Sequence, residues 1–139
     1  EGYCTDMTRN FAFGQLSSEY INKYDLLLKA QEATLKQVKV DISPKKLDTF
    51  CRKQLGDQAE FFTHSLGHGV GLEIHEMPGL SSKYKAQRNF PAKLQTNEII
   101  TIEPGLYYPG KFGIRIEDLV VVKDEGCEVL SKASKLKLD

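Results

Sequence analysis

The three histidines of this chain fall within one short segment, at His64, His68 and His75. The middle one stands in the glycine-rich run 67–71, and glycine in a strand-like segment marks a close approach of the backbone to another backbone or to a ligand. An imidazole at such a point is a suitable metal ligand or proton-transfer group. A single histidine is more often an ordinary core or surface residue, but three in one glycine-rich segment favour a functional site.

Three carboxylates accompany these histidines. Glu103 precedes a Pro-Gly turn at a strand end, and Asp6 lies in a strand-like segment near the N-terminus. Glu117 lies in an alternating segment and shares a face with Arg115, so it either faces water beside that arginine or enters the sheet, where it needs a cation. With His68 these carboxylates form a donor set that suits Mn²⁺, Fe²⁺, Co²⁺ or Zn²⁺. The spacing alone leaves open whether they converge.

Composition narrows the class of protein. The 139 residues suit one domain of ordinary size, and 19 basic against 19 acidic residues argue against a nucleic-acid-binding protein. The longest apolar runs are far too short to cross a bilayer, so no membrane partner is expected. Cys4, Cys51 and Cys127 have no paired spacing and are expected to be free thiols in a reducing compartment, the cytoplasm.

Two helices and several strands are predicted to position these groups. Ser17 or Ser18 caps a first helix that runs to about Val38, and Ser43 caps a second helix that ends at Gly56. Residues that favour strands predict them over 3–13, 68–75, 98–108, 113–123 and 128–130. The order β, α-α, β predicts an α+β fold in which two helices cover one face of a mostly antiparallel sheet.

Four motifs carry a family resemblance, and they occur in the family's order: 6–9, 64–71 with 75–78, 101–107 and 113–118. On these motifs the chain resembles the pita-bread metallopeptidases, which include aminopeptidase P, prolidase and methionine aminopeptidase. The resemblance implies that residues 1–139 are the C-terminal half of a pita-bread fold, part of a single catalytic domain whose N-terminal half is absent. The chain begins at Glu1 instead of Met, which fits a nicked or truncated parent enzyme.

The resemblance also implies a site for two divalent metal ions. Manganese is the expected metal, with cobalt, zinc and iron as alternatives. Asp6, His68, Glu103 and Glu117 match four of the family's five protein ligands, with Asp6 and Glu117 bridging the ions. The fifth ligand, an aspartate, would precede Glu1, so residues 1–139 alone are expected to be inactive.

Further roles follow from the same resemblance. Glu103, His75 and His64 are its catalytic residues. Glu103 acts as general base towards a water or hydroxide held between the ions. His75 stabilises the scissile carbonyl and His64 lines the subsite beyond the cut bond. Arg115 does not bind metal itself but orients the ligand carboxylates, with Glu117 or Asp6 as its partner.

Arg115 and the stretch 107–110 resemble the proline-specific branch of the family. The implied activity is a metal-dependent exopeptidase that releases the N-terminal residue from Xaa-Pro peptides through a metal-bound hydroxide, as aminopeptidase P does. Prolidase is the alternative, followed by methionine aminopeptidase and a non-catalytic binding module. The intact ligand set argues against the binding module. The expected partners are a proline-containing peptide, the N-terminal half of the domain and a second copy in a homodimer.

Overall fold

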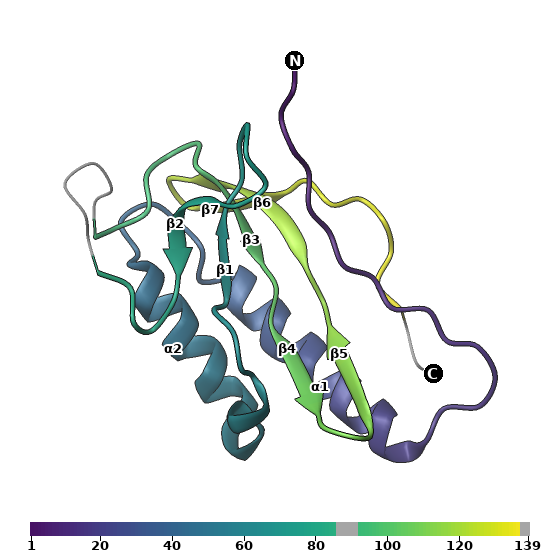
Figure 1. Ribbon diagram of the computed structural model, residues 1–139. Coiled ribbons are helices and arrows are strands. Elements are labelled where there is room, and N and C mark those ends of the chain that lie inside the picture. The colour runs from purple at the N-terminus through teal and green to yellow at the C-terminus, as the bar shows by residue number, and fades with distance from the viewer. Residues whose placement is uncertain (86–91, 137–139) are drawn as a thin grey trace.

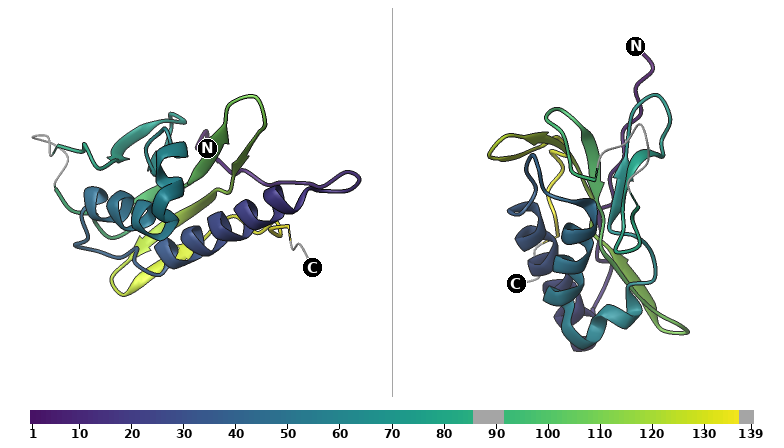
Figure 2. Two further views of the ribbon diagram at one scale, coloured as in Figure 1. Left: turned by 90° about the horizontal axis from the view of Figure 1, so that it is seen from below. Right: turned by 90° about the vertical axis from the view of Figure 1, so that its left-hand side faces the viewer.

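The computed structural model describes residues 1–85 and 92–136. Two helices lie side by side against one face of an antiparallel sheet, as Figure 1 and the right-hand view of Figure 2 show. The helical elements are α1 (Ser18–Leu35), α2 (Pro44–Leu55) and the short 3-10 helix η1 (Gly56–Phe61). No helix in the described ranges is both long and apolar enough to cross a membrane.

The strands form one large sheet and one hairpin. The large sheet has the order β2-β1-β3-β6-β7, and β4 pairs with β5 alone; all the pairings are antiparallel. The bounds are β1 (Gly67–Gly69), β2 (Glu76–Leu80), β3 (Ile99–Ile102), β4 (Gly105–Tyr108), β5 (Phe112–Arg115), β6 (Asp118–Lys123) and β7 (Gly126–Val129). The predicted α+β class, with two helices on a mostly antiparallel sheet, is confirmed.

Local capping explains where the helices begin. The Ser17 hydroxyl accepts a hydrogen bond from the Tyr20 amide at the start of α1, and the Ser43 hydroxyl accepts one from the Lys46 amide at the start of α2. Helix α1 ends at Leu35 and not at Val38, because the amides of Gln37 and Val38 bond to carbonyls three residues back and tighten the last turn. Helix α2 ends at Gly56, as predicted, and this glycine has a φ of 55°.

The predicted strand bounds need correction in several places. Residues 3–13 form no strand, because their one β-bridge joins Thr8 to Glu117. The strand predicted over 68–75 ends at Gly69, and residues 71–75 form the bend that leads into β2. The predicted strands 98–108 and 113–123 are each two strands. The first breaks at 103–104 and the second at 116–117, so each break falls at a carboxylate of the predicted metal site.

The core lies between the helices and the sheet. Its buried apolar side chains come from α1, α2 and the strands that face them; among the largest are Tyr24, Leu27, Leu47, Ile100, Ile102, Leu106 and Ile114. This core fixes the inner face of the sheet, while the strand ends and the breaks stay available for polar groups. The candidate site is built at those breaks.

Candidate metal centre

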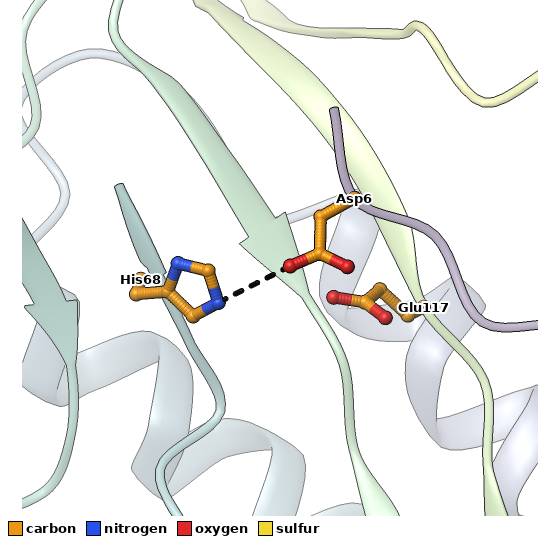
Figure 3. A group of neighbouring side chains, drawn as sticks. All are labelled: Asp6, His68 and Glu117. Atoms are coloured by element: carbon orange, nitrogen blue, oxygen red, sulfur yellow. Dashed lines mark ion pairs between the residues drawn. The ribbon is translucent and has the colours of Figure 1, made fainter. Parts of the chain in front are cut away.

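Three of the predicted metal ligands meet in space (Figure 3). Asp6, His68 and Glu117 each offer a ligand atom, and these atoms all lie within 4.8 Å of one another. Asp6 comes from the N-terminal segment, His68 from β1 and Glu117 from the break before β6. Segments far apart in the sequence therefore supply one group of donors that could hold a metal ion.

Glu103 joins this group through the histidine. Its Oε1 lies 3.3 Å from the Nε2 of His68, and Asp6 Oδ2 lies 3.7 Å from the same nitrogen. The Thr101 hydroxyl, 3.2 Å away, donates to the same Glu103 oxygen and orients it. Glu103 thus lies beside the group of three, against the same nitrogen of His68 that faces Asp6.

The hydrogen bonds of His68 suit metal binding. Its Nδ1 lies 2.9 Å from the carbonyl oxygen of Gly69, and since a carbonyl only accepts, Nδ1 carries the proton. Nε2 faces carboxylate oxygens, so it either carries a second proton that it donates to Glu103 or directs its lone pair at a cation. The hydrogen bond with Glu103 raises the pKa of His68, although burial works against it. A ligating histidine commonly donates its other N–H to a backbone carbonyl, as His68 does here.

Glu117 is buried, with only 2% of its surface exposed. Burial raises the pKa of its carboxyl above the usual range, and the nearby carboxylates of Glu103 and Asp6 add to the effect. Of the two alternatives for Glu117, the buried one is correct. The predicted face shared with Arg115 is wrong, because Arg115 is exposed and the strand alternation is interrupted at Ile116. Several carboxylates gathered at a partly buried point call for a positive charge, and the donor set fits a divalent ion.

Arg115 does not contact either carboxylate that it was predicted to orient. Its Nε donates to the hydroxyl of Thr8 at 3.0 Å, and that hydroxyl donates to Glu117 Oε2 at 2.5 Å. Arg115 thus acts on Glu117 through Thr8. Thr8 was not among the predicted site residues, although it lies inside the first motif, two residues after Asp6.

The two remaining histidines lie differently. The exposed ring of His75 lies against His68, with ring centroids 4.3 Å apart, so His75 borders the centre. His64 donates from Nδ1 to its neighbour's carbonyl, and its Nε2 lies 2.9 Å from the Tyr107 hydroxyl. Arg115 Nη1 reaches the same hydroxyl at 3.4 Å. His64 is therefore tied to the centre through Tyr107, a residue that sequence reasoning did not assign.

Close backbone packing explains why glycine flanks His68. A side chain at Gly67 would collide with the carbonyl of Thr101 in β3, and one at Gly69 would collide with that of Met77 in β2. The sequence left open whether the backbone here approaches another backbone or a ligand. At Gly67 and Gly69 it approaches another backbone, so β1 fits between β2 and β3 only if these two positions carry no Cβ.

The comparisons with known proteins agree with this fold. Residues 1–124 match the model of metallopeptidase family M24, and the chain belongs to that family. It is 47% identical over 133 residues to an uncharacterized peptidase of Methanocaldococcus jannaschii, covering 96% of this chain and 38% of that protein. An uncharacterized peptidase of Staphylococcus aureus is 40% identical over 137 residues, covering 97% and 37%.

Solved structures give the same result. The X-Pro aminopeptidase of Thermotoga maritima superposes with a TM-score of 0.89 at 42% identity, and the Xaa-Pro dipeptidase of Bacillus anthracis with 0.90 at 38%. Each match covers 97% of this chain and 37% of the other. The prolidase of Pyrococcus furiosus gives 0.89 at 35%, covering 96% and 39%. The chain therefore corresponds to the C-terminal part of the pita-bread domain and spans less than two fifths of these relatives.

Proposed function

We propose that the protein containing this chain is a metal-dependent Xaa-Pro exopeptidase that acts as aminopeptidase P does. The observation that carries the proposal is the meeting of Asp6, His68 and Glu117, with Glu103 against the same histidine nitrogen. Membership of a metallopeptidase family and the likeness to an X-Pro aminopeptidase and Xaa-Pro dipeptidases support it. Manganese is the proposed metal, with cobalt, zinc and iron as alternatives.

Asp6, His68, Glu103 and Glu117 would hold the ion. When bound, a divalent ion supplies a Lewis acid that polarises a carbonyl and lowers the pKa of a water molecule. A second ion would need a further carboxylate from outside residues 1–139. We propose on the same ground that these residues alone are inactive and need the remainder of their domain.

The chain's own groups have separate tasks in peptide hydrolysis. Glu103, oriented by Thr101 and His68, accepts the proton of the attacking water and passes it to the leaving amine. His75 is exposed beside the centre and can donate a hydrogen bond to the scissile carbonyl as negative charge develops on its oxygen. His64 is held by Tyr107 and lines the subsite for the part of the peptide beyond the cut bond.

A three-peptide assay tests the activity. The complete natural protein, stripped with a chelator and reloaded with Mn²⁺, is expected to release the first residue of an Xaa-Pro-Xaa tripeptide faster than it cleaves an Xaa-Pro dipeptide or a Met-Ala-Ser peptide. Preference for the dipeptide would indicate a prolidase, and preference for the Met peptide a methionine aminopeptidase. Undiminished hydrolysis by the stripped protein, or failure to take up any divalent ion, would refute the metallopeptidase assignment.

Two matched variants make the assay specific. Asp6→Asn removes a proposed ligand and is expected to abolish hydrolysis, whereas Asp57→Asn alters an exposed aspartate in η1 and is expected to leave it unchanged. A homodimer is proposed from the family resemblance alone, and a cytoplasmic location from the resemblance together with the free thiols of Cys4, Cys51 and Cys127.

A further inference from the structure

We propose that Arg9 and Asp118 form a positioning pair that sets the separation of Asp6 and Glu117 and thereby tunes the affinity of the metal centre. This inference rests on the proposed function, because it assumes that the two carboxylates bind metal. Neither member of the pair is itself a ligand. The pair acts from behind the site, through the backbone that carries the ligands.

The problem that the pair solves is visible in the backbone. Asp6 lies in the segment before α1, which forms no strand and meets the sheet at the bridge between Thr8 and Glu117. The backbone bond there, from the Glu117 amide to the Thr8 carbonyl, is a long 3.3 Å. Side-chain bonds also cross here, from Thr8 to Glu117 and from Asn10 Nδ2 to the Arg115 carbonyl at 2.7 Å. A single long backbone bond nevertheless does little to fix the angle between the two backbones, and a metal ion requires its ligands at defined positions.

Arg9 adds bonds to the backbone carbonyls of both segments. Its Nη1 donates to the Glu117 carbonyl at 2.6 Å and to the Thr8 carbonyl at 3.0 Å, so one nitrogen joins the two facing residues of the bridge. Its Nη2 donates to Asp118 Oδ1 at 2.7 Å. The planar guanidinium directs these bonds in a fixed fork, and the side chain is only 5% exposed. Water therefore competes little for the same acceptors.

Asp118 anchors the arginine to the body of the fold. Its carboxylate is 1% exposed and also accepts hydrogen bonds from Gln31 of α1 at 2.9 Å and from Lys135 of the C-terminal segment at 2.7 Å. Arg9 Nε adds a bond to the carbonyl of Ala133 at 2.8 Å. The pair thus connects the site to the body of the fold. Asp118 bonds to α1 and to the C-terminal segment, and Arg9 bonds to the carbonyls of Thr8 and Glu117.

Metal affinity distinguishes a positioning role from a purely stabilising one. In the complete natural protein, Arg9→Met is expected to raise the dissociation constant for Mn²⁺ about 10- to 100-fold, the usual effect of changing a group that orients metal ligands. Arg9→Lys is expected to fall between it and the parent, because an ammonium keeps the charge but lacks the fork. Titration calorimetry on the metal-free proteins, well below their melting temperatures, measures the dissociation constants of both variants.

Controls separate the outcomes. Lys111→Met removes an exposed cation that pairs with Glu19 and is expected to leave the dissociation constant unchanged. If Arg9→Met fails to fold, Arg9→Lys decides alone: a dissociation constant within twofold of the parent overturns the inference, even where the melting temperature falls. A parent protein that binds none of Mn²⁺, Co²⁺, Zn²⁺ and Fe²⁺ fails one step earlier and overturns the proposed function; if it binds another of these ions in place of Mn²⁺, the titrations use that ion. Co²⁺ absorption in the visible range gives a second readout, and an unchanged spectrum in Arg9→Met also counts against the pair.

Discussion

The carboxylate of Asp48 fastens the segment around β1 and β2 to helix α2. It is fully buried and accepts bonds from the amides of Leu66, before β1, and Ser82, after β2, at 3.1 and 2.8 Å. Arg52, one turn further along α2, donates to it from Nε at 2.9 Å and to the carbonyl of His64 at 2.6 Å. Replacing Asp48 with Ala should therefore loosen the segment that carries the three histidines.

The expected cost can be estimated from these contacts. Removing one member of a buried ion pair costs roughly 3–5 kcal/mol. Arg52 keeps carbonyl acceptors in Phe62 and His64, and its side chain is 29% exposed, so water can reach it. We therefore expect the low end, about 3 kcal/mol of local opening free energy, and with about 1.4 kcal/mol per tenfold this is about a 100-fold increase in the local opening equilibrium.

Hydrogen exchange followed by mass spectrometry measures this opening. In Asp48→Ala, peptides from residues 62–82 should exchange about 100-fold faster, while peptides from 118–129 in β6 and β7 should change little. Asp57→Ala, at an exposed aspartate, serves as the control and should leave both segments as they were. Unchanged protection of 62–82 would refute the role given to Asp48, and an equal loss in both segments would refute its local character.

Two further substitutions test the site. Gly69→Ala would push a methyl group into the β2 backbone and displace β1, so we expect kcat/KM for an Xaa-Pro peptide to fall about 100-fold or more. Gly79→Ala is the control and should match the parent, because its added methyl group meets nothing within 4 Å. Tyr107→Phe removes the hydroxyl beside His64 and should raise KM about fivefold, the effect of losing roughly 1 kcal/mol of binding free energy. Tyr108→Phe is the control and should leave KM unchanged, because the Tyr108 hydroxyl bonds to Gln58 and not to His64. Equal effects within either pair would contradict the reasoning.

Local signals in the sequence predicted the helices well. Ser43, Pro44 and Gly56 specify the start and end of α2 through contacts among near neighbours, and these ends are correct. Strand bounds were predicted less well, because a residue becomes part of a strand only where another segment offers its backbone. Residues 3–13 are rich in residues that favour strands, yet Thr8 alone finds a bridge partner there.

The sequence by itself determined the composition of the site: which residue types are present, in which motifs, and which family they resemble. The tertiary structure decided how they are held. Thr8 meets Glu117 across 109 positions of the chain, and Arg9 meets Asp118 across the same separation. No periodicity or local motif encodes such contacts, because a hydrogen bond depends on distances and angles that exist only after the intervening helices and strands have packed.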